Sequence, residues 1–371
     1  MITRADRREF WSVGQQNGML PIRPAQLENV APEDALARAD EMASALARTP
    51  SAALGIAAEA LDLPDNLDAL TPAASEAAIR AYAFIASRLI HSDSLEAGRL
   101  LTRSIAQPLL TLSQAAGRPA GLTYATYVLA NWLEPLPPRC EPDSIVVPRT
   151  FSGTADEAWF IAVHLSIESM GGEIVAAIAD CQLALDAASG YSLTAPVNRI
   201  ANAIRWATAI LGRIDQRIDP EVFRCKIRPN LHGFANVTFA ADPPASVSYV
   251  GETGAQSGVI QAIDLVLAVR HDDAMQKALA RFRECAPPTH RDFMTGAEAV
   301  GSRLAAEAMS DPHIRRAYVR ALASLHAFRD RHVTIVEHYL RSGTPGTGGT
   351  AGQPWLGNLR DSVSNTASAY L

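Results

Sequence analysis

The spacing of apolar residues along this chain predicts a protein built from helices. Apolar residues, with many Ala and Leu among them, recur three, four and seven positions apart over most of its length, and this spacing places them on one face of a helix. The periodic stretches are residues 32–48, 73–90, 95–115, 155–187, 194–217, 256–270, 274–283, 296–306 and 312–341. Proline and glycine occupy the gaps between them, as expected for turns. The predicted fold class is therefore all-α.

Two stretches without helical spacing organise the chain. Residues 140–154 include a candidate short strand at 145–147 (Ile-Val-Val). We expect this stretch to join a smaller N-terminal helical domain, residues 1–142, to a larger helical domain, residues 143–371. Residues 228–255 show no sustained period and are predicted to form a long irregular segment, which in compact domains is usually functional.

A glycine-rich stretch near the C-terminus is predicted to act as a lid. Residues 343–352 contain five glycines, a composition typical of a flexible linker. A further helical stretch with Trp355, Leu356 and Leu359 follows. A loop held at both ends suits a lid over a site better than a frayed terminus does.

Composition argues against several classes of partner. The 371 residues include 33 basic and 39 acidic side chains, a net charge of −6, and no basic run marks a nucleic-acid or anionic-membrane surface. The N-terminus lacks the apolar core of a signal peptide, and no uninterrupted apolar run reaches spanning length. Four cysteines without paired spacing are expected to be reduced thiols. We therefore expect a cytoplasmic protein with neither a nucleic-acid nor a membrane partner.

His332 interrupts an apolar helical stripe near the C-terminus. The stripe consists of Leu325, Phe328, His332, Ile335, Val336 and Tyr339. An unpaired buried polar group costs roughly 1–3 kcal/mol, so this imidazole needs a partner. Two interpretations remain open: a core histidine bonded to a backbone carbonyl, or an axial ligand to a metal or haem. His326 and His338 have polar or charged neighbours and are expected to face solvent.

His164 is a second histidine on an apolar helical face, which it shares with Phe160, Ile161 and Ile167. The pair His164 and His332 has two interpretations. They are either two separate core histidines, or they flank one flat cofactor, with one bound to iron and the other facing the bound gas or substrate. The sequence alone leaves both open.

Arg228 precedes a proline, and such a junction ends a helix because the residue before proline is pushed out of the helical region. An arginine there, beside aromatic residues, is suited to bind a carboxylate bidentately. The alternative is a surface arginine paired with Glu221 or Asp219.

The glycine-rich residues 251–258 (GETGAQSG) precede a predicted helix, and such a turn can cradle an anion. They lack the Lys-Ser/Thr of a P-loop and no strand is expected before them, which argues against nucleotide binding. Close approach of the backbone to a flat cofactor and a plain helix cap both remain open.

Seven segments in a fixed order resemble the indoleamine 2,3-dioxygenase family, in the bacterial branch of the haem tryptophan-dioxygenase superfamily. They are residues 103–108 (RSIAQP), 124–132 (YATYVLANW), 228–233 (RPNLHG), 254–257 (GAQS) with Asp264, 287–293 (PPTHRDF), 329–332 (RDRH) with Tyr339, and 346–350 (GTGGT). The first hundred residues match only loosely. The resemblance is specific because of the order and spacing of the seven segments, and no single segment would be sufficient.

The resemblance implies a site for haem b and a site for substrate. His332 matches the proximal ligand of the iron. The residues implied to contact the cofactor are Arg329, Gly254, Ala255 and Leu340. Those implied to contact the substrate are Tyr124, Tyr127, Val128, Phe160, Phe223, Arg228, Leu231 and Thr347. Arg228 matches the arginine that pairs with the substrate carboxylate, and Thr347 lies in the loop that closes over the amino acid end.

Two positions depart from the family pattern. His164 stands where animal members carry a serine on the distal side, whereas the related tryptophan 2,3-dioxygenases have a histidine that bonds the indole N–H. We expect His164 to have that orienting, catalytic role. Tyr127 replaces a smaller residue and is expected to narrow the pocket. Both departures bear on which indole is the substrate.

The implied reaction is cleavage of the indole C2–C3 bond of tryptophan or a related indole by dioxygen, to an N-formylkynurenine-type product. It requires an electron donor that keeps the iron ferrous. The alternatives are a haem oxygenase acting on a modified indole in secondary metabolism, a haem-based sensor without turnover, and a haem-free helical scaffold. Arg228 and Thr347 argue against a sensor, which needs neither.

Overall fold

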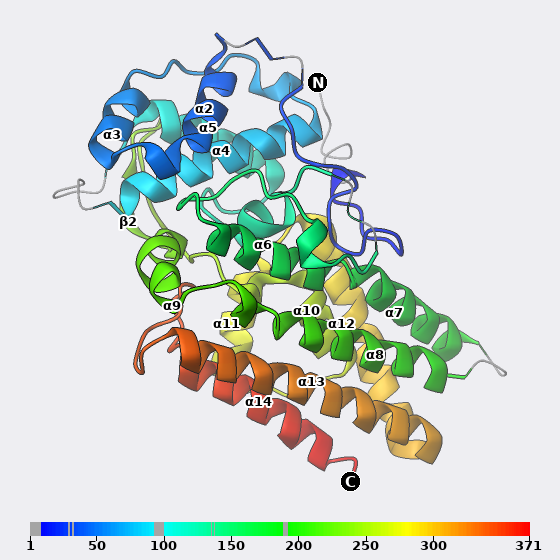
Figure 1. Cartoon of the computed structure of the whole chain (residues 1–371). Helices are drawn as coiled ribbons and strands as arrows, with labels where there is room; N and C mark the ends of the chain where they lie inside the picture. The colour runs from blue at the N-terminus through cyan, green and yellow to red at the C-terminus, as the bar shows by residue number, and fades with distance from the viewer. Residues whose placement is uncertain are drawn as a thin grey trace.

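The computed structural model describes residues 9–28, 30–31, 33–92, 100–134, 136, 138–187 and 192–371. Helices dominate this part of the chain (Figure 1), as predicted. The helices are α2 (Ala35–Ser44), α3 (Ser51–Glu59), α4 (Pro72–Ile90), α5 (Arg103–Ala116), α6 (Ala155–Glu168), α7 (Gly171–Asp186), α8 (Thr194–Leu211), α9 (Pro220–Val222), α10 (Gly258–Val266), α11 (Asp273–Arg283), α12 (Pro288–Ser310), α13 (Pro312–Tyr339) and α14 (Gln353–Ser368). The strands are β1 (Leu100–Leu101), β2 (Phe234–Phe239) and β3 (Ala245–Tyr249).

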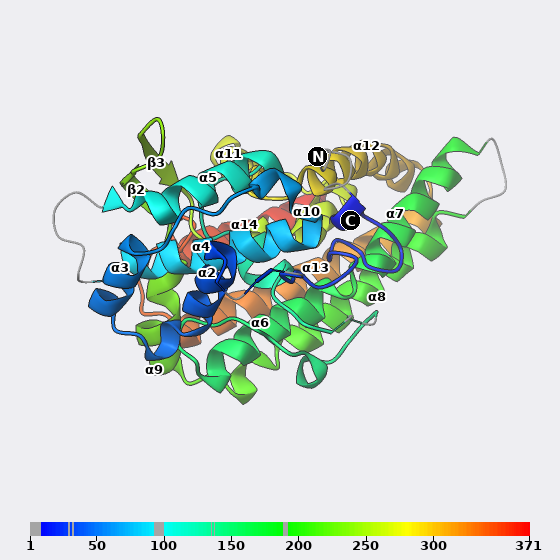
Figure 2. The same ribbon diagram turned by 90° about the horizontal axis from the view of Figure 1, so that it is seen from above.

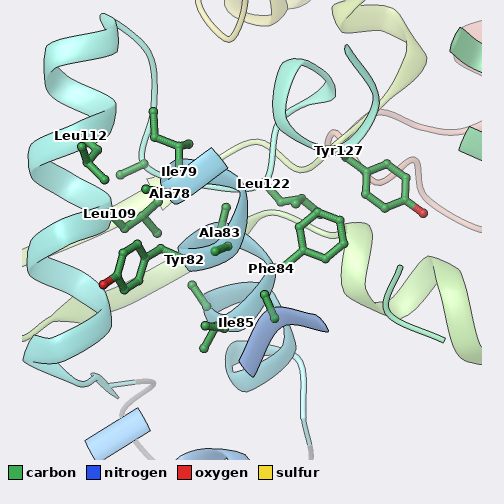
Figure 3. Packing of buried hydrophobic residues seen from close by; sticks show 14 of the residues in the cluster. Ala78, Ile79, Tyr82, Ala83, Phe84, Ile85, Leu109, Leu112, Leu122 and Tyr127 are labelled. Atoms are coloured by element: carbon green, nitrogen blue, oxygen red, sulfur yellow. The ribbon is translucent and has the colours of Figure 1, made fainter. Parts of the chain in front are cut away.

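Two large hydrophobic clusters form most of the interior, and a third, small one joins Met275, Leu279 and Leu359. The first draws mainly on α2 to α5 and the strand β2, and Figure 3 shows Tyr82 of α4 directed toward α5, near Leu109. The second is built around α8, α10, α12 and α13. In Figures 1 and 2 the blue and cyan helices form one layer and the green, yellow and red helices form another.

The helix α6 contributes to both clusters and thereby carries its residues to the boundary between them. Ile161 and Leu165 belong to the first cluster, Val163 and Ile167 to the second. Thr154 begins the helix by accepting a hydrogen bond from the Glu157 backbone N–H, the usual role of threonine at an N-cap. His164, on the same helix, is therefore placed between the two layers.

The long helix α13 packs between α8 and α14. Asp311 caps its first turn, accepting bonds from the backbone N–H groups of His313 and Ile314, and Pro312 occupies its first position, where a missing N–H costs nothing. Its buried stripe faces the second cluster. Residues 343–352 then lead back to α14, which lies alongside α13 (Figure 1).

The prediction of one helix over residues 155–187 was wrong, because the chain breaks between α6 and α7. At Gly172, the second residue of α7, a Cβ would lie 2.2 Å from the carbonyl oxygen of Gln15. The backbone of the N-terminal segment therefore approaches at this point. The stretch Ala155–Asp186 is long and apolar enough to cross a membrane by length and composition, but 89% of an apolar 18-residue window within it is buried inside the protein, as in a core helix.

The prediction of an irregular segment over residues 228–255 was also wrong. It contains β2 and β3, which pair antiparallel, and β2 also pairs in parallel with β1. A register irregularity between Phe234 and Val237 disturbs the alternation that would have predicted a strand. Because β3 ends just before residue 251, the glycine-rich turn does follow a strand, contrary to expectation.

Two local predictions need correction. The candidate strand at 145–147 is extended chain without strand pairing after a short 3-10 turn, Pro142–Ser144. The carbonyl of Val146 accepts one hydrogen bond, from the backbone N–H of Leu133. The helix predicted from residue 95 begins at Arg103, after β1, and the first five of its predicted residues lie outside the described part of the chain.

Candidate active site

Two adjoining cavities lie between α6, α13, α14 and the turn after β3. With the open space at their mouths included, their volumes are about 960 and 610 Å³. Seven residues line both cavities: His164, Leu211, Thr253, Gly254, His332, Trp355 and Leu356. The two histidines, 168 positions apart in sequence, therefore share one space.

The imidazole of His332 is available as a ligand. None of the described residues forms a hydrogen bond with its ring, so the carbonyl-bonded core interpretation has no counterpart in this part of the chain. Burial lowers the pKa of His332 to about 4, and the positive charges that His164 and Arg329 can carry act in the same direction. The ring is therefore neutral at pH 7, the form that binds iron. These features fit a haem ligand.

His164 is held in one tautomer by its own helix. Its Nδ1 lies 2.8 Å from the Phe160 carbonyl oxygen. Since a carbonyl only accepts, Nδ1 carries the proton, and Nε2 of the neutral ring is left as an acceptor. Burial lowers the pKa of His164 and so favours this neutral form. Nε2 of His164 is thereby available as a hydrogen-bond acceptor for a molecule in the cavity.

Arg228 lies in the turn Arg228–Leu231, and its guanidinium lines the larger cavity. Nη1 donates to His232 Nε2 at 3.1 Å, and Nη2 donates to the carbonyl of Pro345. Burial lowers the pKa of His232 to about 4, with contributions from Arg228 and His91, so this imidazole is neutral and accepts. The guanidinium is thus positioned by its neighbours.

The alternative partners considered for Arg228 are engaged elsewhere. Glu221 pairs with Arg224 at 2.9 Å, and Asp219 caps α9 by accepting the backbone N–H of Glu221 at 2.7 Å. The interpretation of Arg228 as a surface arginine paired with either acid is therefore wrong.

Aromatic rings and a closed loop complete the larger cavity. The rings of Phe160 and Phe223 lie 5.3 Å apart, and Tyr339 contacts Phe223 edge-on at 5.6 Å. Thr347 donates its hydroxyl proton to the carbonyl of Glu252, which holds the 343–352 loop against the turn after β3. Of the other predicted site residues, Leu231 and Leu340 also line this cavity.

The smaller cavity is lined by Tyr124, Gly254, Ala255 and Arg329. The Arg329 guanidinium donates to the carboxylate of Asp264. Burial acts to raise the pKa of Asp264, but Arg329 and His271 lower it overall, so the pair is ionised. The ion pair with Asp264 therefore holds the guanidinium of Arg329 at the edge of the smaller cavity.

Tyr127 and Val128 lie away from the cavities, in the first hydrophobic cluster. The Tyr127 ring stacks with Phe84 at 5.7 Å (Figure 3), and its hydroxyl donates to Glu157 at 3.0 Å. Both residues belong to a π-helical turn, Ala125–Leu129, whose wide turn rotates side chains away from the positions of a regular helix. The expectation that Tyr127 narrows the pocket is corrected: its side chain points into the core.

Three functional candidates escaped the sequence reasoning. Glu252 and Glu168 are buried at the cavities, and His232 supports Arg228. Glu168 accepts bonds from Tyr124 and Ser257, and burial raises its pKa to about 7. The available signals were an acid four residues after His164 on the same helix, and an imidazole four residues after Arg228.

Comparisons with known proteins agree with this geometry. A family model described as "Indoleamine 2,3-dioxygenase" matches residues 57–342. The protein named indoleamine 2,3-dioxygenase acdA from Aspergillus candidus is 27% identical over 321 residues, covering 76% of this chain and 79% of its own length. Human indoleamine 2,3-dioxygenase 2 is 26% identical over 291 residues, covering 71% and 72%. The 6-hydroxytryptophan 2,3-dioxygenase fscD from Fusarium equiseti is 27% identical over 278 residues, covering 70% and 66%.

Proposed function

This chain belongs to the indoleamine 2,3-dioxygenase family of haem-dependent dioxygenases, and we propose that its substrate is tryptophan or an indole that keeps tryptophan's carboxylate. One observation carries the proposal: Arg228, His164 and His332 line the same cavity. An anion-binding cation, a hydrogen-bond acceptor and an iron ligand are the three groups that a haem enzyme acting on an indole carboxylic acid needs.

The residues present fit haem b. His332 would hold the iron, and Arg329, Gly254, Ala255 and Leu340 line the space beside it. The bound haem supplies the iron at which dioxygen is activated, and both oxygen atoms are incorporated as the indole C2–C3 bond is cleaved. An electron donor is needed to keep the iron ferrous.

The chain's own residues bind and orient the indole. Nε2 of His164 accepts the indole N–H, which sets the rotation of the ring within the cavity. Phe160 and Phe223 provide aromatic surface against it, since stacked or edge-on rings contribute about 0.5–1.5 kcal/mol beyond burial. A positioned ring is the main physical requirement here, and a general-base role for His164 does not follow.

The other end of the substrate is bound by Arg228. His232 and Pro345 use one contact each on the guanidinium. No other described residue bonds its remaining N–H groups, which can bind a carboxylate. The loop bearing Thr347, held to Glu252, covers this end and limits the entry of water. Exclusion of water strengthens the ion pair between guanidinium and carboxylate.

A ring-substituted tryptophan is the second candidate substrate, supported by the similarity to the Fusarium equiseti protein named as a 6-hydroxytryptophan 2,3-dioxygenase. A cytoplasmic location is a further part of the proposal, supported by the four free cysteines.

The test is turnover of tryptophan and of 6-hydroxytryptophan by haem-loaded, reduced protein in labelled dioxygen. Mass spectrometry should find two labelled oxygen atoms in an N-formylkynurenine-type product of at least one of them. Incorporation of a single labelled atom would instead identify the monooxygenase alternative. No turnover of either indole by ferrous, haem-replete protein would refute the proposal and favour a sensor.

A further inference from the structure

Glu252 is a buried acid that the fold leaves without a partner. Five acidic side chains are buried in the described part of the chain: Glu76, Glu157, Glu168, Glu252 and Asp264. The other four each have an ion pair or a hydrogen bond from a neighbouring side chain or backbone N–H. No described residue forms such a contact with the Glu252 carboxyl group, although the residue is only 3% exposed. A buried charge without a partner is costly.

Glu252 lines the larger cavity. Burial raises the pKa of Glu252 to about 8. A cation bound in the cavity would offset this cost by stabilising the ionised form. The structure therefore presents a buried acid to the space in which the substrate is proposed to bind.

Backbone contacts fix the position of Glu252. The N–H of Glu252 donates to the Leu231 carbonyl at 3.0 Å, and its own carbonyl accepts the Thr347 hydroxyl. At Gly251 a Cβ would lie 2.3 Å from the Leu231 oxygen and 2.4 Å from the Thr347 oxygen, so only glycine permits this close meeting of three segments. Glu252 is thereby held between the turn of Arg228 and the covering loop.

The cavity thus contains a cation and an acid that do not neutralise each other. The Arg228 guanidinium contacts His232 and Pro345, and no ion pair joins it to Glu252. A cation at one point of the cavity, and at another an acid that ionises when a cation binds beside it, match a zwitterion whose carboxylate and ammonium are attached to the same carbon. An indole acid without an amine would satisfy only Arg228.

We propose that Glu252 binds the α-ammonium group of the substrate while Arg228 binds its carboxylate, so that the cavity selects α-amino acids over indole acids that lack an amine. The inference rests on the proposed function and deepens it, because it adds a second recognition point. Glu252 is a binding residue here, with no role in bond cleavage.

Three indoles separate the two charges. Tryptophan carries both groups, indole-3-propionate has the carboxylate alone, and tryptamine has the ammonium alone. Their dissociation constants are measured by calorimetry on haem-loaded parent protein and on the Glu252→Gln and Arg228→Gln variants. Haem content and the midpoint of thermal unfolding of each variant show that it is folded.

Glu252→Gln should weaken tryptophan and tryptamine at least about thirtyfold, the low end for removing one partner of a buried charge pair. It should change indole-3-propionate by less than about threefold. Arg228→Gln should do the reverse, weakening tryptophan and indole-3-propionate but not tryptamine. Glu252→Asp, which keeps the charge on a shorter side chain, should recover part of the tryptamine binding.

Equal weakening of all three ligands by Glu252→Gln, or no weakening of any, would overturn the assignment. If Arg228→Gln still bound tryptophan more tightly than tryptamine by the parent's margin, the two-point assignment would fall, whereas turnover of tryptophan would still support the proposed function. If the parent bound none of the three indoles, both the assignment and the proposed function would fall.

Discussion

Replacing His164 with serine should selectively remove the hydrogen bond that the indole N–H of the substrate donates to this residue. In the structure Nδ1 is committed to the Phe160 carbonyl at 2.8 Å, so Nε2 is the acceptor available to a substrate. A serine hydroxyl has a shorter reach and would leave a buried indole N–H unpaired. Such a group costs roughly 1–3 kcal/mol, which corresponds to a loss of about 5- to 150-fold in kcat/KM for tryptophan.

The matched substrate is 1-methyltryptophan, which has no N–H to lose. We expect it to be a poor substrate for the parent, and its kcat/KM to change by less than about threefold in His164→Ser. The control variant is His326→Ser, because His326 is half-buried on α13 and lines neither cavity. This variant should react with both substrates like the parent.

The assay is steady-state turnover of both substrates by reduced protein, with the Soret band recorded for each preparation. Equal losses on the two substrates would refute the N–H contact and leave His164 as a residue that shapes the cavity. Loss of the Soret band in His164→Ser would point instead to iron ligation or core packing. Only a loss confined to tryptophan, with haem retained, agrees with the geometry.

Three further changes test the site and its support. His332→Ala should abolish or grossly alter the Soret band while His338→Ala leaves it nearly unchanged, and a normal histidine-ligated spectrum in the first variant would remove the assignment. Arg228→Ala should lower kcat/KM for tryptophan about ten- to hundredfold at normal haem content, the loss expected for a charge-assisted bond of roughly 1.5–3 kcal/mol; parent-like kinetics would make the residue structural. Gly301→Ala should lower the free energy of unfolding by about 1–3 kcal/mol, because its Cβ would lie 2.0 Å from a carbonyl oxygen of α10. Gly296→Ala on the same helix meets nothing within 4 Å and should be neutral or stabilising in urea unfolding; equal effects of the two glycine changes would contradict this account of the packing.

Local signals in the sequence were sufficient for the long helices. The stretch predicted over residues 312–341 is α13, Pro312–Tyr339, because its cap at Asp311, its proline and its apolar stripe are all properties of neighbouring residues. The same holds for α4, which Thr71 and Pro72 begin. Helical spacing and capping need no information from the rest of the chain.

Elements that depend on a distant partner were not predictable. The strand β2 pairs with β1 across more than a hundred residues, and its own alternation is broken by an irregularity. Close to the break between α6 and α7, the backbone of Gln15 approaches Gly172. Neither contact leaves a periodic signal in the segment that it shapes.

The candidate site shows the same difference between features set by the local sequence and features set by distant contacts. Local periodicity was enough to place His164 and His332 on apolar helical faces, because it sets the direction of a side chain on a helix. Tertiary packing brings these two faces to one cavity and turns Tyr127 into the core, and it leaves Glu252 without a partner among the described residues in the cavity that Arg228 also lines. Which helices meet, and which buried charges find partners, depends on packing between segments far apart in the chain, and a single segment does not encode that packing.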